Sequence, residues 1–332
     1  MTPGTQEASG TPGAPEASRT PAPEAAEAPD GSATPWNAVS TRTLVHALVR
    51  TDGTVDAGEL YTVAGLLSMS DQQVRLSVKR LVSEGRFTHE GRGRKAVLRA
   101  VADSTGSFAP DADHVRFAYR QDHGLAPWDG RWHLFAFAVP ESARTARDAL
   151  RETLLGLGAA PLQGGLYAAA NPIAPLVEAR AHRLGVASRL TCLTSADLRV
   201  GELSEPRALA AALWPLDEIA ARHEQLAAFA RACLDRPGRR GPTDREPLTD
   251  PERLTDPERL TLAVRLAAAF TYAMRPDPLL PPELLPRPWP GARARELFAS
   301  AWTALTKTPA PETGAPLPRL FALYEDLADP TP

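Results

Sequence analysis

The sequence predicts an α+β protein of several domains, and three observations support this fold class. A helical pattern is followed by a short basic hairpin over residues 70–99. Apolar runs of strand length then alternate with helical patterns between residues 132 and 194. From residue 209 onward the apolar spacing is mostly helical. A chain of 332 residues, 43% of them hydrophobic, has room for two or three domains with their own cores.

The first of these stretches is predicted to be a helix that begins after Ser70. Ser70 is a favourable N-cap residue, and Gln73, three positions later, completes a capping box. Gly85 ends the helix, and strands on either side of loop 90–95 are expected to pair. With two apolar helical patterns upstream, this order predicts a winged helix-turn-helix domain over residues 36–100. The predicted buried stripe of the helix consists of Val74, Val78, Leu81 and Val82.

The same stretch is basic in a chain that is acidic overall. Residues 70–99 hold eight Lys or Arg residues against three Asp or Glu, a net charge of +5, whereas the whole chain carries −3. A local basic patch of this kind favours nucleic-acid binding. An ordinary amphipathic helix with a solvated charged face is the alternative. The residues expected to contact DNA are Gln72, Arg75, Lys79 and Arg80 on the helix and Arg92, Arg94 and Lys95 at the tip of the wing.

These residues have different expected roles. Arg75 and Lys79 are the first choices for base edges in the major groove, because the guanidinium fork matches guanine. The amide of Gln72 suits adenine, although a solvent-facing role is an equal alternative. Arg80 is expected either to touch phosphate or to pair with Glu84 one turn later. The three basic wing residues are expected to hold the DNA backbone or enter the minor groove, which sets affinity more than sequence choice.

Residues 113–200 are predicted to form a ferredoxin-like α+β domain. The pattern runs β-α-β-β-α-β within about seventy residues, the order that this fold requires. The predicted elements are a strand at 132–139, a helix over about 144–157, a strand pair bent at Gly164 and Gly165, a helix at 172–184 and a strand at 188–194.

Residues 205–308 are predicted to form a helical C-terminal domain. A proline-bearing linker lies near 235–256, and the hexapeptide TDPERL occurs twice, at 249–254 and 255–260. Proline after aspartate suits the first turn of a helix, so the second copy is expected to begin one. The predicted helices lie at 209–233, 257–274 and 292–306, and the proline-rich segment 277–291 is expected to cross in an extended form before the last of them.

The remaining features bear on location. Residues 1–35, rich in Pro, Ala and Glu, are predicted to be a disordered acidic tail. No apolar run approaches the roughly eighteen residues that a membrane span needs, and the N-terminus lacks the order of a signal peptide. Cys192 and Cys233 have no metal-ligand spacing. The chain is therefore expected to be cytoplasmic, with no membrane partner.

The sequence gives little support for catalysis. A metal-dependent phosphodiesterase built on a ferredoxin-like domain needs an aspartate after its first strand to hold Mg²⁺. Strand 132–139 contains no acidic residue, and Glu141 follows it alone. We therefore expect a protein that is not an enzyme and has no catalytic residue, metal or cofactor. Metal-dependent nucleic-acid processing by the central domain is the alternative function. A winged helix that binds protein instead of DNA is a third interpretation, which the basic patch disfavours.

Three separated stretches resemble the PaaX family of bacterial transcriptional repressors, named for the control of phenylacetic acid degradation. The resemblance spans roughly residues 40–305. The three stretches are QQVRLSVKRLVSEGRF with the wing GRGRK; WDGRWHLFAFAVPE at 128–141, continuing to residue 172; and DPLLPPELLPRPWPG at 277–291 with ARELF at 294–298. The first stretch is generic to winged helices, and the third is the most specific to the family.

The resemblance implies a three-part architecture whose central domain is similar to the small ferredoxin-like CRISPR-associated nucleases. It also implies a homodimer that binds a palindromic double-stranded DNA operator and is released by a small acyl-CoA effector such as phenylacetyl-CoA. The acidic tail and the repeated TDPERL segment depart from the family pattern, and effectors differ among paralogues of such families.

An aromatic acyl-CoA effector needs an apolar slot for its acyl group and cations for its phosphates. On this chemistry the candidate effector residues are Trp128, Arg131, Trp132 and Trp289. Core tryptophans and a surface arginine are the alternative interpretation of the same four residues.

Overall fold

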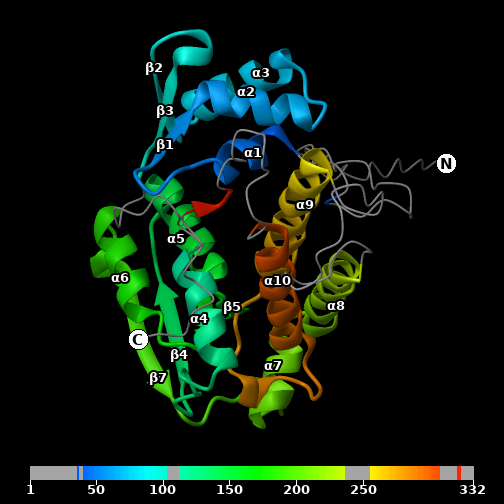
Figure 1. Ribbon diagram of the computed structural model, residues 1–332. Helices are drawn as coiled ribbons and strands as arrows, with labels where there is room; N and C mark the ends of the chain where they lie inside the picture. The colour runs from blue at the N-terminus through cyan, green and yellow to red at the C-terminus, as the bar shows by residue number, and fades with distance from the viewer. Residues whose placement is uncertain (1–35, 37–39, 103–111, 236–254, 307–319, 323–332) are drawn as a thin grey trace, which may run out of the picture. The chain divides into compact units, whose positions relative to one another are not determined.

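The structure is a computed structural model that describes residues 36, 40–102, 112–235, 255–306 and 320–322 (Figure 1). The predicted tail at 1–35, most of the linker near 235–256 and the first TDPERL copy lie outside the described residues. The described part is α+β, with two small antiparallel sheets, which confirms the predicted class.

The first group of elements combines three helices with a small sheet. The helices are α1 (Thr41–Ala47), α2 (Ala57–Leu66) and α3 (Asp71–Ser83). The strands are β1 (Thr54–Asp56), β2 (Phe87–Glu90) and β3 (Val97–Ala100), which pair antiparallel in the order β1-β3-β2. Strand β1 is not predicted from the sequence, because three residues show no periodicity of their own. This strand exists through its pairing with distant β3, where Val55 faces Leu98.

Apolar side chains from every helix of this group meet beneath the sheet. Val74 and Leu81 of α3 are fully buried, whereas Val78 and Val82 are partly buried, so the predicted stripe packs inward. The residues that they join in one core include Leu44, Leu48, Leu60, Phe87 and Leu98.

The second group follows helix α4 (Ala112–Asp122) and has the order β-α-β-β-α-β, as predicted. Its sheet has the strand order β5-β6-β4-β7 and is antiparallel throughout, the arrangement of a ferredoxin-like fold. Its elements are β4 (Trp132–Phe137), α5 (Arg144–Gly156), β5 (Ala160–Gln163), β6 (Leu166–Ala169), α6 (Ala174–Arg183) and β7 (Leu190–Ser195).

Strand β4 is mostly apolar on both faces, apart from the buried His133, because both faces of this sheet are covered. Phe135 packs with Leu150 and Leu154 of α5 and with Val177 of α6. Trp132 and Leu134 belong to a second core, on which residues of the helical segment that follows also pack. The continuous apolar run of the sequence is thus a strand with two buried faces.

The last group is helical and consists of α7 (Pro206–Leu213), α8 (Leu216–Leu234), α9 (Asp256–Met274) and α10 (Pro290–Thr306) (Figure 1). The helix predicted from residue 209 is broken in two at Trp214 and Pro215, since proline cannot continue the hydrogen-bond ladder. Helix α9 begins with a capping box between Thr255 and Glu258, which confirms that the second TDPERL copy starts a helix. The crossing segment is not wholly extended, because a short 3-10 turn, Pro282–Leu284, interrupts it.

Candidate nucleic-acid interface and buried ionic cluster

The start of α3 is held by the capping box that the sequence predicts. The Gln73 backbone N–H donates to Ser70 Oγ at 3.3 Å, and the Ser70 backbone N–H donates to Gln73 Oε1 at 2.8 Å. The preceding connection is tight, with Ser68 at a φ of 58°. These local contacts determine where α3 begins and hence which of its side chains face outward.

The outward side of α3 carries exposed, mostly basic side chains. Gln72, Arg75 and Lys79 are exposed, and no ion pair joins them to an acidic group among the described residues. Arg75 Nε donates to the Asp71 carbonyl at 3.2 Å, so its side chain lies along the helix, and no carboxylate of the described residues binds its terminal nitrogens. Arg80 instead lies 3.4 Å from Glu84, which also binds Arg42 at 2.8 Å. The ion pair with Glu84, one of the two roles expected for Arg80, is therefore present.

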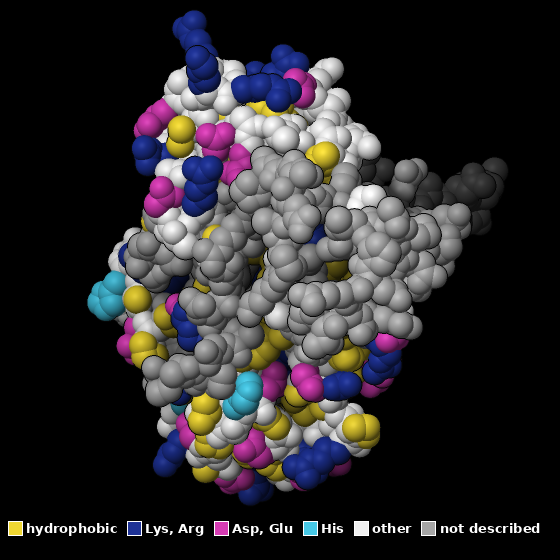
Figure 2. Space-filling model, in the orientation of Figure 1, with side chains coloured by type: hydrophobic (Ala, Val, Ile, Leu, Met, Phe, Trp, Pro, Cys, Tyr) yellow, Lys and Arg dark blue, Asp and Glu magenta, His cyan; other side chains and the backbone are white. Residues whose placement is uncertain are grey.

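The loop between β2 and β3 places the Arg94 side chain against the neighbouring helices. The Arg94 guanidinium lies over the Tyr61 ring of α2, 5.4 Å from its centroid, and 3.7 Å from Asp71 of α3. Arg92 and Lys95 are exposed, and neither has an ion pair within the described part of the chain. Figure 2 shows Lys and Arg side chains gathered over this hairpin and the neighbouring helices.

The four candidate effector residues do not together line either of two hollows, one beside Trp289 and one between α1 and α3. Trp128 and Trp132 contact edge to face at 5.7 Å, and Trp132 is almost wholly buried, stacked on Trp214. Arg131 is exposed, and its carbonyl accepts a hydrogen bond from Trp128 Nε1. Trp289 contacts His223 edge to face and packs, like Trp128, against the core that contains Trp132. Only Trp289 lines the hollow described next.

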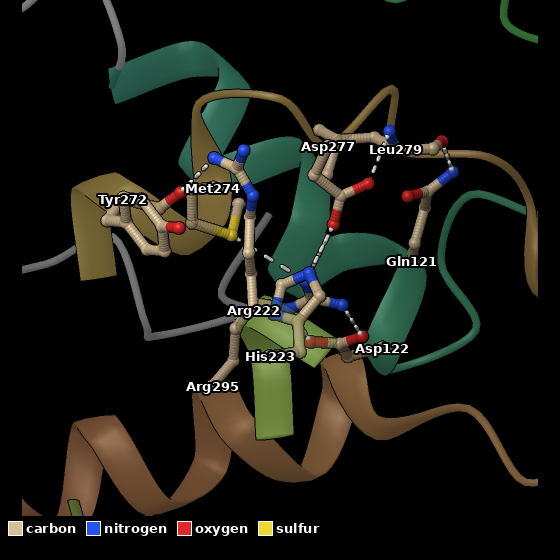
Figure 3. Close-up of polar contacts among 9 residues, drawn as sticks. All are labelled: Gln121, Asp122, Arg222, His223, Tyr272, Met274, Asp277, Leu279 and Arg295. Atoms are coloured by element: carbon tan, nitrogen blue, oxygen red, sulfur yellow. Dashed lines mark hydrogen bonds and ion pairs between the residues drawn. The ribbon is translucent and has the colours of Figure 1, made fainter. Parts of the chain in front are cut away.

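This hollow, of about 250 Å³, lies between the end of α4, the proline-rich segment and the start of α10. Its wall is partly apolar, through Leu280, Leu285 and Pro286, and partly ionic. The ionic part is a buried cluster that Figure 3 shows in detail. Arg295 of α10 binds Asp122 of α4 through two hydrogen bonds of 2.6 Å each.

Asp277 completes the buried cluster. Its carboxylate accepts a 2.7 Å hydrogen bond from His223 Nε2 and a 2.8 Å bond from the Leu279 backbone N–H, and Arg295 Nη1 lies 3.7 Å away. Burial alone would raise the pKa of Asp277, but the hydrogen bond and charge of His223, with Arg295 and the Leu279 N–H, hold this pKa below its ordinary value. Asp277 is therefore held as a buried carboxylate.

Sequence reasoning missed this cluster entirely. Its members lie up to 173 residues apart, on α4, α8, the segment after α9 and α10. Each is an ordinary charged residue in its local pattern. The available clue was that Asp277 and Arg295 both fall in the third stretch that resembles the PaaX family.

Glu141, the acidic residue that follows strand β4 and was considered as a metal ligand, forms ion pairs with two arginines. The exposed Glu141 pairs with Arg147 at 2.8 Å and with Arg144 at 3.8 Å. Across the described residues, no three His, Cys, Asp or Glu side chains are grouped closely enough to hold a metal ion. None of the described helices is long and apolar enough to cross a membrane.

Two domain families match consecutive parts of the chain. The PaaX protein central Cas2-like domain matches residues 125–210, and the PaaX-like protein C-terminal domain matches residues 214–311. These domains define a class of regulatory rather than enzymatic proteins. The matches together cover more than half of the chain, which belongs to the PaaX family. Membership is consistent with a transcriptional regulator of phenylacetic acid catabolism.

Among solved structures, an uncharacterized protein of Mycobacterium tuberculosis, Rv0674, is similar to this chain with a TM-score of 0.46. The two sequences are 21% identical, and the match covers 81% of this chain and 97% of the other. No curated protein sequence matches the chain.

Proposed function

We propose that the protein is a DNA-binding transcriptional regulator in which residues 36–100 form a winged helix-turn-helix. In this proposal α3 is the recognition helix and the β2–β3 hairpin is the wing. The observation that carries it is the exposed face of α3, where Arg75 and Lys79 have no carboxylate partner within the described residues. Cations left unpaired on a capped, rigid helix suit a polyanion that supplies the missing charge.

The contacts of the other basic residues assign them different parts in this proposal. Arg92 and Lys95, both exposed, would contact phosphates. Arg94 would chiefly hold the wing against α2 and α3, because its guanidinium already meets Tyr61 and Asp71. Arg80, paired with Glu84, would contribute less than Arg75 to base recognition.

The same proposal includes an effector and a homodimer, both implied by the family. The protein would repress as a homodimer on a double-stranded operator and leave it when a small acyl-CoA, such as phenylacetyl-CoA, binds. The hollow beside Trp289 supports an acyl group as the part bound there, since its 250 Å³ is small for a complete ligand. Exposed Arg287 on its lining offers a cation for the phosphates.

The test is a fluorescence-anisotropy titration of the full chain against duplex DNA from the region upstream of its own gene. It is run at two salt concentrations, with and without phenylacetyl-CoA. We expect tight binding that falls steeply with salt and is reversed by the ester. Binding that ignores the ester removes the effector from the proposal. No binding at low salt removes DNA binding itself. Cleavage of the same duplex with Mg²⁺ would favour the enzymatic alternative.

A matched pair of variants makes the titration specific to α3. Arg75→Ala with Lys79→Ala removes the two unpaired cations of this face, and we expect loss of the tight complex. Arg144→Ala with Arg147→Ala removes two cations from α5 of the central domain, where both pair with carboxylates. This second variant should bind as the unchanged protein does. Equal losses from both pairs would show that only total charge matters.

A further inference from the structure

An exposed leucine occupies the middle of the α3 face proposed to meet DNA. Leu76 has 61% of its surface exposed, the largest value for a large hydrophobic side chain among the described residues. Leu76 is not among the residues that the sequence predicts to contact DNA. Singly exposed leucines are common on protein surfaces, so its meaning depends on its neighbours.

Helical spacing places Leu76 on one row with the polar residues of this face. Gln72 precedes it by one turn and Lys79 follows it by three residues, the spacing at which side chains lie side by side on a helix. The row is opposite the buried Val74. Leu76 is therefore the apolar centre of an otherwise polar and basic outward face.

Leu76 also contributes to the wall of a shallow hollow between α1 and α3. The hollow measures about 260 Å³ and has Leu81 and two arginines, Arg42 and Arg80, in its lining. Both arginines are bound to the single carboxylate of Glu84, which leaves a net charge of +1 beside the apolar surface. Such a surface accepts an apolar group attached to an anionic partner.

Duplex DNA has one apolar group at the base edges of its major groove, the C5-methyl group of thymine. We infer that Leu76 contacts a thymine methyl group and makes the protein prefer thymine at one position of each half-site. This inference rests on the proposed DNA binding by α3. It adds an apolar contact to the polar readout expected from Gln72, Arg75 and Lys79.

The experiment removes the methyl group from the DNA and the leucine from the protein, separately and together. The probe is a duplex that the full-length protein selects from a random-sequence library. Each thymine of the selected site is replaced in turn by deoxyuridine, which lacks only the methyl group. We expect one replacement in each half-site to weaken binding by about fourfold, the factor for one buried methyl group. With Leu76→Ala the same replacement should have no effect.

Two further variants separate the contact from general damage. Leu76→Met keeps an apolar side chain and should restore most of the sensitivity to deoxyuridine. Leu176→Ala removes another strongly exposed leucine, from α6 (53% exposed), and should leave that sensitivity unchanged. Because Leu76 is exposed, its truncation should change the free energy of unfolding by less than about 0.5 kcal/mol.

The outcomes distinguish this inference from the proposed function. Selection of a defined site with no thymine whose methyl effect depends on Leu76 overturns the inference and leaves DNA binding by the protein in place. Failure to select any sequence overturns the proposed function, and this inference with it. A Leu76→Ala protein that binds every duplex as the unchanged protein does would indicate that Leu76 faces a different partner.

Discussion

The arginines of the proposed DNA-binding surface differ in the contacts that they make within the protein. Arg75 donates Nε to its own helix, and its terminal nitrogens have no carboxylate partner in the described part of the chain, whereas Arg94 is held by Tyr61 and Asp71. A pre-positioned guanidinium with free terminal nitrogens suits two hydrogen bonds to one guanine. Under the proposed function, Arg75 therefore serves base recognition and Arg94 the support of the proposed wing.

Arg75→Ala is expected to relax specificity at one base pair. The loss of discrimination against the wrong base there should be about 1–3 kcal/mol, while binding to scrambled duplex changes little. Affinity for the selected duplex and for its single-base variants, measured by anisotropy, provides the check. Arg94→Ala should instead weaken binding to all duplexes by a similar factor. Equal losses on selected and scrambled DNA from Arg75→Ala would remove its assignment.

Asp277 makes the stability of the protein depend on pH in the acidic range. Its pKa in the folded protein lies below the ordinary value of 3.8, so the folded state binds this proton less readily than the unfolded state. The stabilisation is complete above the unfolded pKa and is lost as pH falls through the lower folded value. We expect the difference in unfolding free energy between the unchanged protein and Asp277→Asn to shrink below pH 3.8.

Urea denaturation at a series of pH values between about 6 and 3 measures this difference. Asp197→Asn, which removes an exposed carboxylate, serves as the control. A difference for Asp277→Asn that stays constant across the series would contradict the assignment of a lowered pKa to Asp277.

At the scale of elements, the turn after α5 meets the proline-rich segment without space between their backbones. Gly158 has a φ of +85°, and a Cβ atom added there would lie 2.5 Å from the Pro278 carbonyl oxygen. The Gly158 carbonyl also accepts a hydrogen bond from Trp214 Nε1. This glycine therefore lets the central sheet and the crossing segment pack closely.

Gly158→Ala is expected to lower the free energy of unfolding by more than about 2 kcal/mol, because strain at positive φ adds to a backbone clash. Gly185→Ala is the matched control. Gly185 has a φ of +69°, but nothing lies within 4 Å of its added Cβ atom, so only the cost of positive φ applies, about 1 kcal/mol. Thermal or urea unfolding compares the two variants. Equal losses would show that the contact with Pro278 relaxes without cost.

At the scale of the whole described chain, the ion pair of Asp122 and Arg295 links helix α4 to α10. Helix α4 follows the proposed winged helix in sequence, and the hollow beside Trp289 adjoins this ion pair. A ligand in the hollow would therefore lie next to the contact that fixes α4. If the proposed function holds, this arrangement offers a physical route from the effector to the elements proposed to bind DNA.

Arg295→Met is expected to destabilise the protein by about 3–5 kcal/mol, since it removes the cation that pairs with the partly buried Asp122 and lies beside the buried Asp277. Arg293→Met, on the same helix, breaks the exposed pair with Glu296 and should cost less than about 1 kcal/mol. Urea denaturation measures both. A loss from Arg295→Met as small as that from Arg293→Met would mean that the buried cluster contributes little to stability.

The sequence by itself determined the elements whose causes are local. The capping box of Ser70 and Gln73, the helix start at the second TDPERL copy and the order of strands and helices around Gly164 and Gly165 were all predicted correctly. In each case the deciding groups lie within a few residues of one another, so the pattern alone contains the information.

The tertiary structure alone decided the features that depend on distant partners. Strand β1 needs β3, and the buried carboxylate of Asp277 needs His223 and Arg295. That Trp289 lines the hollow whereas Trp128 and Trp132 do not depends on how the crossing segment packs. Exposure also belongs here, because it is a property of the packed chain. Leu76 has the same local pattern as a buried leucine, and only the packing of α3 leaves it uncovered.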